Sequence, residues 1–144
     1  MAATFVYPFT KLPDGTKRPL VPVIIENPFT GQTQLVMALL DTGADANCFP
    51  AFIATNTGHD LKHADVVTSV NTGLEGNHTT TWKHSFKVQL LESGTMKPVW
   101  KTKQILVDCV DHNNMPPLLG CRGFLCELKI TFNYKTSRII IELP

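Results

Sequence analysis

The stretch Leu39-Leu40-Asp41-Thr42-Gly43-Ala44-Asp45 places a carboxylate at the end of an aliphatic run and directly before a Thr-Gly pair. The aliphatic run predicts a strand, and Asp-Thr-Gly predicts a tight turn after it. Gly43 permits close backbone approach or a positive φ, and Thr42 offers a hydroxyl. Such a turn can hold a reactive carboxylate at the floor of a cleft, or it can be an ordinary Asx turn. The tripeptide alone leaves both interpretations open.

The segments around this stretch predict an all-β chain of many short strands. Apolar and β-branched residues at 20–26, turn residues at 27–31 and an apolar run at 34–40 predict a hairpin, and Pro22 predicts an edge position for its first strand. Residues 47–65 show no regular pattern. Further strands are expected at residues 66–70, 79–90, 99–110, 129–133 and 138–143, and the one short helix at residues 124–128.

Length and composition limit the classes of function. A chain of 144 residues fits one compact domain, which we divide into an N-terminal arm, residues 1–17, and a domain, residues 18–144. The net charge of +1, with scattered basic residues, disfavours binding to nucleic acid. The longest apolar run, residues 35–40, is far shorter than the roughly 20 residues that cross a membrane, so no membrane partner is expected.

Four motifs follow one another in a characteristic order. Arg18-Pro19-Leu20-Val21 precedes the hairpin, the stretch with Asp41 ends it, and a glycine turn at Gly73-Leu74-Glu75-Gly76 precedes Leu118-Leu119-Gly120. Together they resemble the retroviral-type aspartic proteases, the retropepsins, from residue 18 to about residue 132. The resemblance implies an all-β, retropepsin-like acid protease fold, in which a closed, barrel-like monomer with a flap hairpin and one short helix forms a homodimer.

The resemblance also assigns roles to residues. Asp41 is the catalytic aspartate, and Thr42 and Gly43 complete the active-site turn. The residues assigned to substrate binding are Leu39, Ala44, Asp45, Cys48, Gly73, Leu74, Glu75, Pro116 and Leu118. Leu119 and Gly120 support the turn from behind, and Arg18 pairs with Asp45 of the partner subunit. Because the side-chain pockets are apolar, we expect apolar residues on both sides of the cleaved bond.

A single catalytic aspartate requires a second chain. Of the seven aspartates, only Asp41 is followed by Thr-Gly or Ser-Gly, so the second carboxylate must come from another copy across a twofold axis. Two adjacent carboxyl groups share one proton, so that one acts as a base and the other as an acid. We therefore expect an aspartic endopeptidase that needs no cofactor, prefers mildly acidic pH and processes a polyprotein. The alternative is a homodimeric peptide-binding or scaffolding module with little turnover.

Other reactive residues give weaker signals. His59 and His63 have the spacing of a helical metal pair, but no Glu follows His59, so we expect solvated loop histidines and no metal site. The four cysteines lack the spacing of a disulfide scaffold or zinc site, and Cys121 and Cys126 are expected to pack in the interior. Cysteine-histidine catalysis stays formally open. Reduced thiols indicate the cytoplasm or the inside of a virus-like particle.

Overall fold

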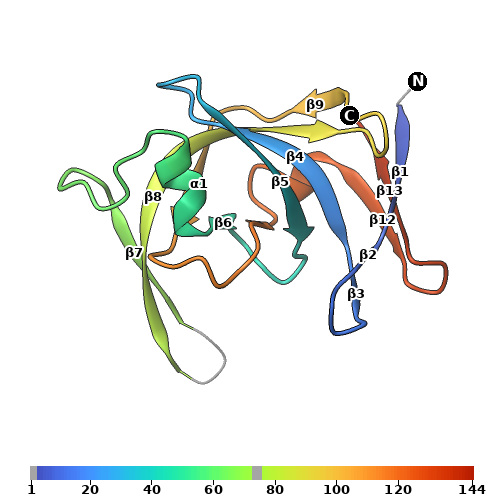
Figure 1. Cartoon of the computed structure of the whole chain (residues 1–144), viewed down its shortest axis with the longest axis horizontal. Helices are drawn as coiled ribbons and strands as arrows, with labels where there is room; N and C mark the ends of the chain where they lie inside the picture. Colours follow the sequence, from blue (N-terminus) through green and yellow to red (C-terminus); the bar gives the residue numbers. More distant parts are fainter. Residues whose placement is uncertain (1–2, 73–75) are drawn as a thin grey trace.

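The computed structural model describes residues 3–72 and 76–144. It is built mostly of strands (Figure 1). The elements are β1 (Thr4–Pro8), β2 (Thr10–Lys11), β3 (Lys17–Arg18), β4 (Leu20–Glu26), β5 (Thr33–Leu40), β6 (Cys48–Phe49), α1 (Ala51–Asn56), β7 (Thr68–Thr72), β8 (His78–Leu91), β9 (Pro98–Lys101), β10 (Ile105–Cys109), β11 (Leu118–Leu119), the 3₁₀ helix η1 (Leu125–Glu127), β12 (Lys129–Asn133) and β13 (Arg138–Glu142). No helix of the described residues is long and apolar enough to cross a membrane.

The largest sheet closes on itself. Its strands follow the order β10-β6-β11-β5-β4-β8-β7, and β8 also pairs with β10, so the strands from β10 to β8 form a ring. The long strand β8 makes this possible, because successive parts of it pair with β7, β10, β4 and β9. The ring confirms the predicted barrel-like monomer.

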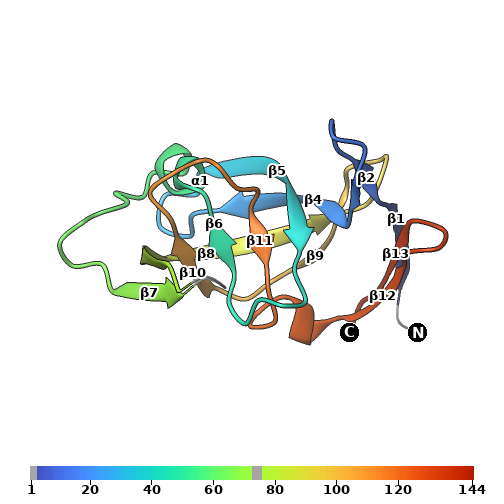
Figure 2. The same ribbon diagram turned by 90° about the horizontal axis from the view of Figure 1, so that it is seen from below.

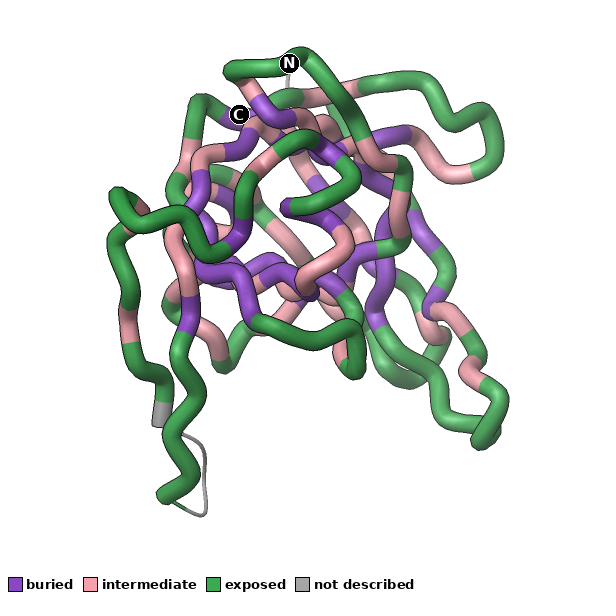
Figure 3. Tube along the Cα trace, turned by 60° about the vertical axis from the view of Figure 1, so that its left-hand side comes forward, coloured by how far each residue is buried: buried purple, intermediate pink, exposed green. Residues whose placement is uncertain are grey.

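Alternate side chains of the ring strands point inward and form the core. Phe86, Val88 and Leu90 of β8 are fully buried, and so are Val23 and Ile25 of the paired strand β4. Figure 3 shows buried segments in the centre of the molecule, whereas β7 and the start of β8 extend away from it and are largely exposed. Each buried side chain of this size contributes about 1.5–3 kcal/mol relative to an exposed one.

The two ends of the chain share a second sheet. Its order is β1-β13-β12, with antiparallel pairing throughout, and it lies on the opposite side of the molecule from β7 (Figure 1). Tyr7 of β1 is buried, and its hydroxyl donates a hydrogen bond to the carbonyl oxygen of Leu91 at 2.7 Å. Part of the predicted N-terminal arm is thus packed against the barrel.

Three predictions about elements differ from the structure in position or type. The α-helix is α1, within residues 47–65, where no regular pattern was seen, because a helix of six residues that buries only Ile53 and Ala54 is too short to show a period. The predicted helix at residues 124–128 is the 3₁₀ helix η1. The predicted strand at residues 99–110 is interrupted near Thr102, whose hydroxyl oxygen accepts a hydrogen bond from the backbone N–H of Val88 at 2.9 Å.

The edge position predicted from Pro22 is also wrong for the strand as a whole. β4 lies between β5 and β8 in the ring. Pro22 pairs with Met37 of β5, and the pairing of β4 with β8 begins only at Val23. Because proline has no N–H to donate, β4 tolerates it at the end of the strand that β8 does not reach.

Candidate active site

The Asp41 turn follows β5 and presents a carboxylate at the surface of the barrel. Oδ1 of Asp41 accepts a hydrogen bond from the backbone N–H of Gly43 at 3.0 Å. The backbone N–H of Asp41 donates to the carbonyl oxygen of Leu119 at 2.9 Å. Asp41 is half-buried, whereas Thr42 and Gly43 are exposed. The carboxylate is therefore held in place on one side and open on the other.

Within one subunit, neither a positive φ nor crowding requires a glycine at position 43. Gly43 is absent from the described glycines that have a positive φ. A Cβ atom at this position would lie 3.4 Å from Oδ1 of Asp41, which is ordinary contact.

β11 supports the turn from behind, as the resemblance implies. It lies between β5 and β6 (Figure 2), where Leu118 pairs with Leu39 and with Cys48, and Leu119 pairs with Leu40. Leu119 is fully buried. A strand of two residues thus joins the segments on both sides of the Asp41 turn.

Gly120 is required where β11 ends. A Cβ atom there would lie 2.5 Å from the carbonyl oxygen of Ala46 and 2.7 Å from that of Ala44, so no other residue fits without backbone movement. The next two residues continue the contact, because Cys121 N–H donates to Ala44 O and Arg122 N–H donates to Asp45 O, both at 2.9 Å. The segment after β11 is therefore bonded to the loop that follows Asp41 at Ala44 and Asp45.

Asn47 completes this arrangement and was missed at the level of sequence. Its side chain is buried, with Oδ1 accepting the N–H of Gly120 at 2.7 Å and Nδ2 donating to the carbonyl oxygen of Arg122 at 2.8 Å. A buried amide satisfied at both ends fixes the distance between two loops. The only signal in the sequence is a polar residue directly before the apolar pair Cys48-Phe49.

A groove of about 450 Å³ runs from the loop after Asp41 to β7. Its lining contains Ala44, Asp45, Ala46, Cys48, Val70, Asn71, Asp108 and Leu118. Four of these are predicted substrate residues, namely Ala44, Asp45, Cys48 and Leu118. The other predicted residues of the described chain lie elsewhere: Leu39 is half-buried within β5, and Pro116 is exposed before β11.

The predicted flap coincides with a hairpin of β7 and β8, paired from Thr68 with Trp82 to Thr72 with His78. Its predicted tip residues Gly73, Leu74 and Glu75 lie outside the described residues. The strands that carry the tip extend beside the groove, since Val70 and Asn71 of β7 contribute to its lining. The described part of the hairpin thus covers one side of the groove.

Asp108, which lines the groove, forms a partly buried ion pair. Asp108 of β10 is 5% exposed, and its Oδ1 lies 2.7 Å from Nζ of Lys83 on β8. The sequence analysis did not select Asp108, although an aspartate inside an apolar strand was visible. Burial, and then the charge of Asp108, raises the pKa of the Cys48 thiol to about 11. A thiol that stays protonated is a poor nucleophile, which disfavours the cysteine mechanism at this position.

Arg18 and Asp45 are both exposed, and neither forms an ion pair within residues 3–72 and 76–144. Arg18 lies in β3, opposite Thr10 of β2. The predicted partner of Arg18 belongs to another subunit, so this pairing stays a prediction.

His59 is not the solvated loop residue that we expected. Its Nε2 donates to the carbonyl oxygen of Ser85 at 2.8 Å, and its ring centroid lies 4.5 Å from that of His84. His84 is buried and donates to the carbonyl oxygen of Leu61 at 2.8 Å. Nδ1 of His63 accepts the backbone N–H of Asp65 at 3.1 Å. His59 and His63 thus have different hydrogen-bond partners in different parts of the structure.

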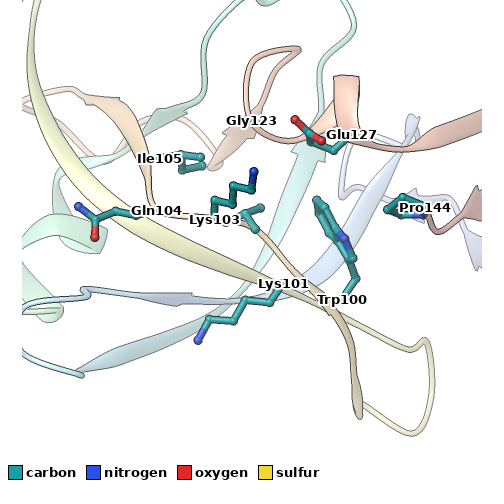
Figure 4. Close-up of a pocket in the computed structure, with 9 residues that line it drawn as sticks. Trp100, Lys101, Lys103, Gln104, Ile105, Gly123, Glu127 and Pro144 are labelled. Atoms are coloured by element: carbon teal, nitrogen blue, oxygen red, sulfur yellow. The ribbon is translucent and has the colours of Figure 1, made fainter.

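A separate hollow of about 400 Å³ lies between the link from β9 to β10, η1 and the end of the chain. Figure 4 shows Trp100, Lys103 and Glu127 around it. None of the residues that line it belongs to the Asp41 turn or to the groove beside β7. It is thus a feature distinct from the candidate active site.

Comparison with known proteins gives matches at the level of structure. No family model matches the chain, and no curated protein matches it. A retropepsin-like aspartic protease from Rickettsia conorii is similar with a TM-score of 0.56 and 18% identity, over 99% of this chain and 94% of that chain. The retroviral protease-like domain of Ddi1 from Leishmania major is similar with a TM-score of 0.50 and 15% identity, over 88% of this chain and 94% of that domain.

The first of these similarities extends over nearly the whole architecture. It includes the closed ring and the terminal sheet, because 99% of the chain is aligned. At such low identity, the likeness concerns the fold and not the chemistry. The chain has the fold of the retropepsin-like aspartic proteases.

Proposed function

We propose that the chain is an aspartic endopeptidase that is active as a homodimer and cleaves extended peptides. The observation that carries this proposal is the position of the Asp41 carboxylate. Its Oδ1 accepts the backbone N–H of Gly43 at 3.0 Å, and the turn then leads into the groove. An Asx turn with only a structural role would not need a groove beside it. The structural neighbours, which are named as aspartic proteases or as protease-like, support the same class of reaction.

The proposed chemistry uses two copies of Asp41. When two carboxyl groups lie about 3 Å apart, they hold one proton between them, because two negative charges at that distance repel. The ionised group takes a proton from a water molecule, whose oxygen attacks the carbonyl carbon of the peptide bond. The protonated group donates to the carbonyl oxygen and stabilises the tetrahedral intermediate. Collapse breaks the C–N bond, and the leaving nitrogen takes up a proton. We propose that Thr42, which is exposed beside the carboxylate, contacts the second copy.

The groove supports an extended peptide as substrate. Its apolar lining includes Cys48, Val70 and Leu118, which favours apolar side chains near the cleaved bond. β7 lies on one side, so the peptide can bind in strand fashion through backbone hydrogen bonds. We propose a polyprotein as the natural substrate. We also propose a reducing location, the cytoplasm or a virus-like particle, which fits the free thiols of the four cysteines.

The test is the variant Asp41→Asn, assayed on a long unstructured peptide. We expect cleavage to fall by at least about a thousandfold, since an amide cannot act as the base, while dimerisation measured by sedimentation stays nearly unchanged. Asp65→Asn is the matched control, because Asp65 is 93% exposed and lies outside the groove. This variant should cleave at the wild-type rate.

Survival of cleavage in Asp41→Asn contradicts the proposed chemistry. The alternative, a peptide-binding module with the same fold, predicts a different result: the wild-type chain dimerises and binds peptide but does not cleave it. Product analysis by mass spectrometry, beside peptide binding measured by fluorescence anisotropy, separates these outcomes.

A further inference from the structure

We infer that Cys121 and Cys126 form a thiol–disulfide site, and that its oxidation by a low-molecular-weight disulfide such as glutathione disulfide prevents the pairing of two chains. The inference rests on the proposed function for its effect on cleavage. The thiol chemistry itself rests only on the geometry of the residues around a second, smaller groove beside the catalytic turn.

This second groove has a volume of about 220 Å³ and lies between the catalytic turn, η1 and β12. Its lining is Thr42, Cys121, Leu125, Cys126, Leu128, Ile130 and Phe132. Apart from Thr42 and the two thiols, every lining side chain is apolar. Because Thr42 lies next to Asp41, a second copy that brings its own Asp41 close must also cover this groove.

The two cysteines are close to each other. The backbone N–H of Cys126 donates to the carbonyl oxygen of Cys121 at 2.9 Å, which folds the intervening residues into a compact turn. Both residues line the second groove, and after the loss of solvent around Cys121, the neighbouring Cys126 helps to raise the pKa of the Cys121 thiol. A disulfide needs about 2.05 Å between the sulfur atoms, so its formation draws the two side chains together.

Exposure selects these cysteines over the other two. Cys126 is exposed and Cys121 is half-buried. Cys109 is buried, and burial holds the pKa of the Cys48 thiol at about 11. Because a thiol reacts as an accessible thiolate, the exposed Cys126 is the residue that a dissolved disulfide meets first.

The reaction proceeds in two exchanges. The Cys126 thiolate attacks one sulfur of glutathione disulfide, forms a mixed disulfide and releases one glutathione thiolate. The Cys121 thiolate then attacks the sulfur of Cys126, which breaks the mixed disulfide and releases the second glutathione. In sum, two protein thiols lose two protons and two electrons, and one glutathione disulfide becomes two glutathione thiols.

Oxidation changes the surface that a partner must cover. The backbone N–H of Cys121 donates to the carbonyl oxygen of Ala44 in the loop after Asp41. Because Cys126 lies in η1, a disulfide between the two cysteines shifts that loop and η1 together. Both cysteines line the apolar groove, so moving their side chains alters its shape beside Thr42. The oxidised chain should therefore stay monomeric at concentrations where the reduced chain pairs.

The experiment compares wild type, Cys121→Ser and Cys126→Ser after exposure of the folded protein to glutathione disulfide. Free thiols are counted by alkylation, the disulfide is located by peptide mapping, and association is measured by sedimentation.

In wild type we expect two of the four thiols to be lost, a Cys121–Cys126 bond and no retained glutathione. Cys121→Ser should retain one glutathione on Cys126, because the resolving thiol is missing. Cys126→Ser should keep its dimer and its activity under oxidation. Wild-type cleavage should fall at least about tenfold and return with a reductant, since a chain that does not pair lacks the second carboxylate.

The inference is overturned if Cys121 and Cys126 stay reduced in the folded protein, or if the oxidised wild type still forms dimers. It is also overturned if Cys126→Ser loses as much activity as wild type under oxidation. Mapping and sedimentation require no activity. A chain that forms the disulfide and loses its dimer, yet cleaves no peptide when reduced, supports this inference and contradicts the proposed function alone.

Discussion

At the scale of single residues, the Asp41 turn is supported by the buried amide of Asn47, which does not line the groove beside that turn. Asn47 bonds to both Gly120 and Arg122 and so joins the loop after β11 to the loop that carries Asp41. We expect Asn47→Ala to lower the free energy of unfolding by about 1–3 kcal/mol, because it leaves a buried N–H and a carbonyl oxygen without their partner. It should lower kcat more than it raises KM, because the carboxylate loses its support while most of the groove remains. Denaturant unfolding and steady-state kinetics measure the two effects.

The control for this prediction is Asn56→Ala. Asn56 is exposed, and its Nδ2 bonds only to the side chain of Gln34 at 3.2 Å. This change should alter the free energy of unfolding by less than about 0.5 kcal/mol. If both variants behave alike, Asn47 has no positioning role.

A histidine supplies a second prediction at this scale. The pKa of His59 is lowered below 6.5, mainly by burial, against the opposing effect of the Ser85 carbonyl and with a further contribution from His84. Since the unfolded chain then binds the proton more readily than the folded chain, stability is full above pH 6.5 and falls as the pH drops below it. Denaturation midpoints across pH should show this slope. His59→Phe should flatten it, whereas the exposed His63→Phe should keep the wild-type slope.

At the scale of elements, β11 and the residues after it pack so closely against the loop after Asp41 that an added side-chain atom does not fit at Gly120. We expect Gly120→Ala to destabilise the fold by at least about 1–3 kcal/mol, because the added methyl group meets two carbonyl oxygens and not flexible side chains. Gly94→Ala is the comparison, since Gly94 has a φ of +85° and nothing within 4 Å of an added Cβ. Its cost of about 1–2 kcal/mol comes from the backbone conformation alone. Cleavage per folded molecule should fall only in Gly120→Ala, which unfolding curves and activity assays on both variants can check.

The sequence could predict those elements whose stabilising interactions are between residues close together in the chain. The β4–β5 hairpin was predictable because its turn is encoded locally: Asn27 accepts the N–H of Phe29 with its side chain, and Gly31 has a positive φ. The break between β9 and β10 was not predictable, because it depends on Thr102 bonding to Val88 on another strand. The same holds for the site. The Asp41 turn shows in the sequence, whereas Asn47 and Asp108 gain their roles only from loops and strands distant in the chain.

At the scale of the whole molecule, the proposed mechanism assigns half of a catalytic pair to each subunit, and this leads to a measurable consequence. If each active dimer needs two intact Asp41 side chains, a chain with Asp41→Asn still pairs with wild type but forms an inactive mixed dimer. In an equal mixture with random pairing, about half of the wild-type chains have a wild-type partner, so activity per wild-type chain should fall to about one half. Excess Asp41→Asn should lower it further. The measurement is the cleavage rate at fixed wild-type concentration during titration with the variant, after enough time for subunit exchange.

Asp41→Asn that also carries a surface change able to block pairing serves as the control and should have no effect. A rate that stays constant throughout the titration, with mixed dimers present by mass, would mean that one aspartate suffices and that the twofold mechanism is wrong.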